Sequence, residues 1–144
     1  MTTPGFTLRQ VLLAAVSYFG LVFGAGFMLG AIRVPLLVPR LGERAAELLE
    51  MPLMVGVTVL AARFVVRRHA VPLQWSVRAR VGAIALALLI GAELLLAVVM
   101  QDRSLAQYIA SRDPVSGIAY LMALLLYAAM PCLLMRFRRP ASNN

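Results

Sequence analysis

The sequence predicts an all-α integral membrane four-helix bundle, N-in and C-in, with short amphipathic extracytoplasmic segments. Three observations lead to this prediction. Hydrophobic residues make up 62% of the 144 residues, whereas soluble domains contain about 45–50% apolar residues. Four apolar stretches are long enough to cross a bilayer, which takes about 20 helical residues. The arginines are also divided unequally between the two sides that such spans create.

The predicted spans belong to one membrane domain covering residues 1–144, and they run over about 11–32, 48–66, 81–100 and 118–135. The first span is longer than the apolar core of a typical signal sequence, and no small-residue cleavage site closes it. We therefore expect it to be retained as a membrane helix.

Glycines form two pairs on the first span, Gly20 with Gly24 and Gly26 with Gly30. At 100° per residue, Gly20 and Gly26 point about 240° apart, so the pairs occupy roughly opposite faces. Small residues let membrane helices approach closely. The pairs therefore predict close packing against two neighbours in the bundle, or against the bundle and a second copy. The alternative is that glycine is simply frequent in membrane helices.

The arginine distribution predicts the orientation. One side carries nine arginines and no acid: Arg9, Arg63, Arg67, Arg68, Arg78, Arg80, Arg136, Arg138 and Arg139. The other balances five arginines (Arg33, Arg40, Arg44, Arg103, Arg112) with five acids (Glu43, Glu47, Glu50, Asp102, Asp113). By the positive-inside rule both termini are cytoplasmic. The net charge of +8 then indicates contact with anionic headgroups on the cytoplasmic side, and no nucleic-acid partner is expected.

The first connection is expected to begin extended, because Pro35 and Pro39 disfavour helix in the residues before them. From about Leu41 a helix should run into the second span and bend at Pro52.

Three carboxylates on that helix, Glu43, Glu47 and Glu50, share one face, and Arg40 and Arg44 flank them. The pattern fits a solvated charged stripe better than a metal site, because no histidine lies on this side of the membrane. We expect no metal.

The other connections predict anchors and caps. Trp75 with Arg78 and Arg80 is typical of an interfacial anchor at the headgroups. After the third span, Leu105, Tyr108 and Ile109 fall at helical spacing and predict a short interfacial helix. Ser116 is expected to cap the fourth span.

In the fourth span, Pro131 should remove one backbone hydrogen bond. Tyr127 should carry its hydroxyl to the middle of the membrane, where Tyr18 and Ser17 are the candidate partners.

Glu93 is the strongest functional candidate, because it is the one acid inside a long apolar run. An ionisable group at membrane depth is costly and marks a functional site by default. Topology places it in the outer half, at a level where Arg33 and Glu50 can converge with it. Two interpretations follow: a structural Arg33–Glu93 ion pair, or a cavity open to the outside where Arg33, Arg40 or Arg44 recruits an anionic group.

The function classes follow from these candidates. No Walker loop, dinucleotide-binding glycine motif, zinc motif or nucleophile elbow is present, so we expect no cofactor. Cys132 is alone, which excludes an internal disulfide. The leading hypothesis is a non-enzymatic accessory or transport/permeation component of the bacterial inner membrane, acting as a homo-oligomer or with a partner membrane protein. The alternatives are a small enzyme acting on a lipid or isoprenoid-type substrate, and a structural subunit of a larger complex.

Overall fold

The computed structural model of the protein describes residues 5–101, 104–110 and 113–137. In these ranges the chain forms helices and no strand: α1 (Leu8–Leu36), α2 (Val38–Leu41), α3 (Glu43–Arg68), α4 (Trp75–Gln101), α5 (Leu105–Ala110) and α6 (Pro114–Leu133). Four of these helices, α1, α3, α4 and α6, are long and apolar enough to cross a membrane. The predicted all-α membrane four-helix bundle is therefore confirmed.

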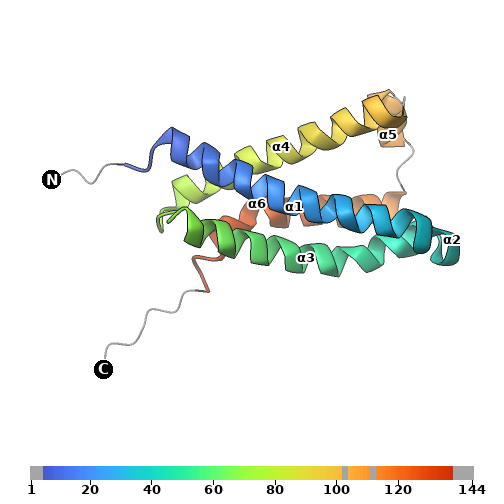
Figure 1. Cartoon of the computed structure of the whole chain (residues 1–144), viewed down its shortest axis with the longest axis horizontal. Helices are drawn as coiled ribbons and strands as arrows, with labels where there is room; N and C mark the ends of the chain where they lie inside the picture. Colours follow the sequence, from blue (N-terminus) through green and yellow to red (C-terminus); the bar gives the residue numbers. More distant parts are fainter. Residues whose placement is uncertain (1–4, 102–103, 111–112, 138–144) are drawn as a thin grey trace.

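Each long helix packs against two others. α1 and α6 both contact α3 and α4, so the order around the bundle is α1, α3, α6, α4. The start of α1 and the end of α6 lie at one end of the bundle, and α2 and α5 lie at the other (Figure 1). We call the first the terminal end, which also holds the α3–α4 turn, and the second the distal end.

The arginine-rich segments lie at the terminal end, as the topology prediction requires. Arg9 lies at the start of α1, Arg67 and Arg68 in the last turn of α3, Arg80 near the start of α4, and Arg136 after α6. Asp102, Arg103, Arg112, Arg138 and Arg139 lie outside the described residues.

The first connection is helical where an extended start was predicted. Pro35 lies inside α1 and Pro39 in the first turn of α2. A proline is tolerated in a first turn, where its missing N–H has no helical partner to lose. α2 ends at Gly42, whose φ of +83° is a conformation that glycine adopts without a Cβ penalty. α3 then continues through Pro52 without interruption.

Asp113, and not Ser116, caps α6. The Asp113 carboxylate accepts hydrogen bonds from the backbone N–H groups of Val115 (3.1 Å) and Ser116 (3.0 Å). The Ser116 hydroxyl instead donates to the backbone carbonyl of Asp113. Aspartate is among the preferred N-cap residues, and Pro114 follows it in the first turn. A short helix, α5, lies in the third connection as predicted, while the side chains of Leu105, Tyr108 and Ile109 fall outside the described part.

The buried core gathers at the terminal end. Small and β-branched residues of α1, α3 and α4 meet there: Val11, Ala14, Ala15, Ala61, Ala62, Val65, Val77, Val81 and Ala85 are all buried. Two helices approach closely at Gly82 of α4, where an added Cβ would lie 1.9 Å from the carbonyl oxygen of Ala128 in α6. Only a residue without a side chain permits that contact.

Arg78 is part of this core, which corrects its assignment as a headgroup anchor. It is 2% exposed. Its guanidinium donates to the carbonyl oxygens of Pro72 (3.1 Å), Pro131 (3.0 Å) and Val71 (3.4 Å). The first two donors therefore join the α3–α4 turn to the end of α6. A planar group with five N–H donors can satisfy several carbonyls that no helix satisfies. Trp75 remains exposed at the start of α4, as expected of an anchor.

Pro131 leaves one backbone carbonyl of α6 without its helical hydrogen bond, and a side chain of α1 donates to that carbonyl instead. Because proline has no N–H, the carbonyl of Tyr127 lacks its helical donor. The Tyr18 hydroxyl donates to that carbonyl at 2.7 Å, and the two tyrosine rings stack with centroids 4.5 Å apart. The contact spans the diagonal of the bundle. Tyr18 is thus the partner of Tyr127 through its backbone and ring, while Ser17 bonds Leu13 and His69 instead.

Candidate functional site

The distal half of the bundle encloses a cavity of about 270 Å³. All four long helices contribute to its wall. The polar side chains that line it are Arg33 from α1, Glu47, Glu50 and Thr58 from α3, Glu93 from α4, and Tyr120 and Tyr127 from α6. The rest of the wall is apolar, with Phe23, Met51, Met54, Leu89, Leu96, Leu124 and Leu126 among its members. The site therefore combines a polar cluster with an apolar body, which is typical of small-molecule sites.

The helix lengths explain why polar groups converge here. Arg33 lies in the last turn of α1 and Glu50 in the third turn of the antiparallel α3, so the short α2 connection brings them to the same level. The Arg33 guanidinium lies 3.1 Å from Glu50 and 4.0 Å from Glu47. One cation is thus shared by two carboxylates.

This pairing differs from the Arg33–Glu93 ion pair, which is one of the two interpretations of the sequence. Within the described residues no ion pair joins Arg33 to Glu93. Glu93 instead accepts a hydrogen bond from the hydroxyl of Tyr120. The predicted convergence of Arg33, Glu50 and Glu93 is nevertheless seen, because all three line the same cavity. Arg33 is paired with Glu47 and Glu50 of α3, whereas Glu93 on α4 turns to Tyr120 of α6.

Several polar atoms in the wall have unused hydrogen-bonding capacity. Arg33 Nε, Glu50 Oε2 and the Tyr127 hydroxyl are buried and make no hydrogen bond in the part of the chain that is described. Glu50 Oε2 faces Arg33 at ion-pair distance, so its charge is compensated although its lone pairs are not aligned with a donor. Tyr127 is only 2% exposed. Buried polar groups without partners are uncommon and require an explanation.

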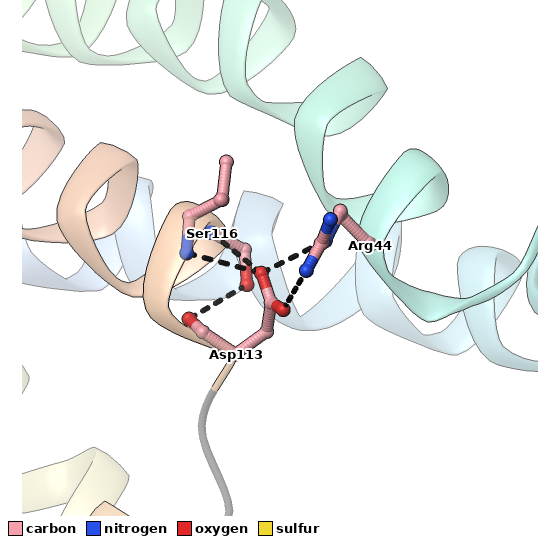
Figure 2. Close-up of polar contacts among 4 residues, drawn as sticks. Arg44, Asp113 and Ser116 are labelled. Atoms are coloured by element: carbon pink, nitrogen blue, oxygen red, sulfur yellow. Dashed lines mark hydrogen bonds and ion pairs between the residues drawn. The ribbon is translucent and has the colours of Figure 1, made fainter.

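Arg40 and Arg44 do not belong to the cavity. Arg40 is exposed on α2, and Glu43 is exposed at the start of α3. Arg44 makes a two-pronged contact with the Asp113 carboxylate, which fastens the start of α3 to the cap of α6 (Figure 2). The hydrogen bond from Arg44, reinforced by backbone N–H donors, lowers the pKa of Asp113 from 3.8 to about 2. This pair is a surface clamp beside the site.

The two glycine pairs of α1 make almost no close helix contacts within a single chain. A Cβ at Gly20, Gly24 or Gly30 would meet nothing within 4 Å, and one at Gly26 would meet only the flexible end of Met54 at 3.4 Å. Gly26 and Gly30 line the cavity. Gly20 and Gly24 are exposed, so their packing against a second copy stays a prediction.

The cavity reaches the outer surface of the bundle beside α1. Phe27 lines it and is also 59% exposed, which places this ring at its rim. Figure 1 shows α4 diverging from α1 toward its C-terminal end. In a protein whose helices face lipid, Phe27 lies where the cavity meets the hydrocarbon.

Sequence reasoning missed three members of the site: Tyr120, Thr58 and the hydroxyl of Tyr127 as a lining group. Tyr120 lies seven residues before Tyr127 and so on the same face of α6, at the level of Glu93. That spacing was a usable signal. Thr58 carried no such signal, because a lone threonine in an apolar helix is ordinarily bonded within its own helix.

Comparison with protein-family models, curated proteins and solved structures gives no match for this chain. The chemistry of the site must therefore be argued from its own residues. It can bind a polar group between Arg33, Glu47, Glu50 and Glu93, and it can hold an apolar body against the deeper wall.

Proposed function

We propose that the protein is a ligand-binding membrane component of the accessory or transport class, whose ligand occupies the distal cavity. The observation that carries this proposal is the cavity itself: about 270 Å³ of space with a charged cluster at one level and apolar walls below it. A bundle that served only as a membrane anchor would gain stability by filling this volume with side chains. An unfilled space lined by costly polar groups is better explained by an occupant.

In the proposed orientation the cavity belongs to the outer half of the membrane. The arginine-rich terminal end supports this orientation, because the positive-inside rule assigns such an end to the cytoplasm. We therefore propose a bacterial inner membrane location, with anionic headgroups around the terminal end and the ligand arriving from the outer leaflet or the outer water.

Binding followed by hand-over fits the geometry better than an open pore. Below the cavity, Tyr18 and Tyr127 stack across the bundle and Arg78 joins the helix ends. Passage through a single chain would require these contacts to separate. A second copy packed on the exposed Gly20–Gly24 face, or a partner protein, would supply a route beside the closed floor.

A second candidate is an enzyme acting on a lipid or isoprenoid-type substrate. The hydrogen-bonded Glu93–Tyr120 couple in the cavity wall favours it, because a carboxyl and a phenol in contact can relay a proton to a bound group. In this case Glu93→Gln would keep the fold and abolish product formation. In a binding component the same variant would alter ligand affinity or flux only.

Cysteine accessibility tests the proposal. In a Cys132→Ala background, Ala123→Cys places a thiol on the cavity wall and Leu125→Cys places one on the exposed outer face of the same helix. An impermeant, positively charged methanethiosulfonate reagent is added to spheroplasts that contain either protein. We expect Ala123→Cys to react at least tenfold faster than Leu125→Cys. Equal rates with this reagent, and again with a membrane-permeant maleimide, would mean that the cavity is reached neither from the outer water nor from the outer leaflet, and would overturn the proposed function.

A further inference from the structure

Among the residues that the structure describes, the wall of the distal cavity carries more acid than base, and this sets the class of ligand. Arg33 faces two carboxylates, Glu50 at 3.1 Å and Glu47 at 4.0 Å. One guanidinium neutralises one carboxylate, so this trio alone has a formal surplus of one negative charge. Glu93 lies on the same wall, where it accepts a hydrogen bond from the hydroxyl of Tyr120. An anionic ligand would meet this surplus directly, which argues against the recruitment of an anion by Arg33.

A second observation concerns the deep end of the cavity, which is formed by Tyr127 and is called its floor. The Tyr127 side chain is almost completely buried, lines the cavity, and keeps a hydroxyl without a hydrogen-bond partner in the described chain. Its ring is fixed by the stack on Tyr18. Tyr127 lies seven residues along α6 from Tyr120, which is about 10 Å at the helical rise. The cavity thus presents charge at one level and an unused hydroxyl about two helical turns deeper.

The intervening wall is apolar. Met54, Leu89 and Leu124 lie among the residues that separate the charged level from Tyr127. Methionine and leucine side chains offer a flexible surface that accepts aromatic or aliphatic bodies. The exposed Phe27 at the rim gives such a body a path from the hydrocarbon region.

From these features we infer that the cavity binds an elongated organic cation: an ammonium group at Glu47 and Glu50, an apolar body along the wall, and a hydrogen-bonding group at Tyr127. The ammonium supplies donors to the unaligned Glu50 Oε2 and compensates the surplus charge. The far polar group satisfies the buried Tyr127 hydroxyl. This inference rests on the proposed function, since it names the ligand class of the same cavity.

Three small compounds separate the contributions of the ammonium group, the aromatic ring and the hydroxyl to binding. Tyramine carries an ammonium, an aromatic ring and a distant hydroxyl; phenethylamine lacks the hydroxyl, and 4-ethylphenol lacks the amine. Binding to the purified full chain in nonionic detergent is measured by titration calorimetry. We expect tyramine to bind most tightly, phenethylamine next, and 4-ethylphenol at least tenfold more weakly than phenethylamine. Equal binding of phenethylamine and 4-ethylphenol would overturn the inference, because the charge would then play no part.

Matched variants locate the two ends of the ligand. Glu50→Gln and Glu47→Gln should each weaken phenethylamine binding by about tenfold, which corresponds to about 1.4 kcal/mol. Glu43→Gln removes a carboxyl from the same helix outside the cavity and should change nothing. Tyr127→Phe keeps the ring stack but should abolish the advantage of tyramine over phenethylamine. Unfolding midpoints of all variants are measured alongside, and Glu47→Gln serves where Glu50→Gln does not fold. A loss of affinity in Glu43→Gln equal to that in Glu47→Gln would contradict the assignment.

The ammonium group can belong to a free amine or to the headgroup of an ethanolamine lipid. Repeating the phenethylamine titration in nanodiscs with and without phosphatidylethanolamine distinguishes these sources. Weaker binding in the presence of that lipid identifies the headgroup as the competitor, and unchanged binding identifies a free amine. If none of the three compounds binds while Ala123→Cys remains reactive, the ligand class is wrong and the proposed function stands. If Ala123→Cys is also unreactive, both fail.

Discussion

The two ends of the bundle use the same four helices in opposite ways. At the terminal end, Gly82 lies against the backbone of α6, and Arg78 and Tyr18 bond carbonyl groups that the helices leave without donors. At the distal end the same helices surround about 270 Å³ of space. The terminal end is a closed core, and the distal end holds a cavity that is the candidate site.

The difference follows from side-chain size and from where the polar groups find partners. Alanine, valine and glycine at the terminal end let the helices approach, which leaves Arg78 no route to water, so it bonds backbone oxygens. At the distal end, long charged side chains line the cavity, and Arg33 pairs there with Glu47 and Glu50. The comparison predicts that substitutions at the terminal end change stability, while those at the distal end chiefly change binding.

The largest expected effect is at Arg78. Arg78→Met keeps an unbranched apolar stem but removes the donors to Pro72, Pro131 and Val71. Buried carbonyls without partners cost about 1–3 kcal/mol each, so we expect a loss of about 3 kcal/mol or more in the free energy of unfolding. Arg80→Met, two residues along and exposed, is the control and should change little. Thermal unfolding in detergent measures both. Equal midpoints would mean that Arg78 is not part of the core.

The next effect is at Gly82. Gly82→Ala places a Cβ 1.9 Å from the Ala128 oxygen, so α4 and α6 must separate. Overpacking of this kind costs about 1–3 kcal/mol. Gly91→Ala on the same helix meets nothing within 4 Å, and the better helix propensity of alanine should leave stability unchanged or slightly higher. Unfolding midpoints of the two variants are compared directly. A midpoint for Gly82→Ala at or above that for Gly91→Ala would contradict the close approach.

These two residues also show how far the sequence could predict the fold. The spans, their order and the clustering of arginines at one end follow from hydropathy and charge, and the structure agrees. Gly82 could not be distinguished from Gly20 or Gly24 in the same way, because glycine spacing shows which residues are small and not which face meets a neighbour. Arg78 looked like an anchor because the sequence places it beside Trp75 and Arg80. The burial of Arg78 depends on the α3–α4 turn, which covers it at the terminal end and in which Val71 is itself buried.

The sequence singled out four charged residues that line the cavity, but it did not predict how they pair. Glu93, Arg33, Glu47 and Glu50 were identified because charges near membrane depth are costly wherever they lie. Which carboxylate reaches Arg33 depends on helix rotation, and the weak amphipathic pattern of an almost wholly apolar helix does not define that rotation. The same limit applies to Tyr120, whose contact with Glu93 requires α4 and α6 to be neighbours.

A smaller effect is expected at Tyr18, where the closed core meets the cavity floor. Tyr18→Phe keeps the ring stack on Tyr127 and removes the hydroxyl that serves the carbonyl opposite Pro131. The loss should be about 1 kcal/mol, the usual net contribution of one hydrogen bond. The variant Tyr18→Phe/Pro131→Ala restores a helical N–H to that carbonyl. It should therefore lose less stability relative to Pro131→Ala than Tyr18→Phe loses relative to wild type. Equal losses in the two backgrounds would show that the hydroxyl does not replace the missing N–H.

The smallest effect is at the distal surface, where Arg44 and Asp113 clamp α3 to α6 in solvent. The pKa of Asp113 is lowered to about 2 in the folded protein, so the folded state favours its charged form. This contribution to stability is fully present above the ordinary pKa of 3.8 and is lost as the pH falls from there toward 2. Asp113→Asn keeps a capping side chain and removes the charge. The difference in unfolding midpoint between wild type and Asp113→Asn should be a few degrees or less at pH 6 and should shrink toward pH 2.

Arg44→Gln should reproduce the midpoint of Asp113→Asn at pH 6. A difference between wild type and Asp113→Asn that persists unchanged at pH 2 would rule out the charge as its cause. Because the clamp lies outside the cavity wall, phenethylamine affinity should be the same in Arg44→Gln and wild type, which separates what holds the distal helices together from what the site between them binds.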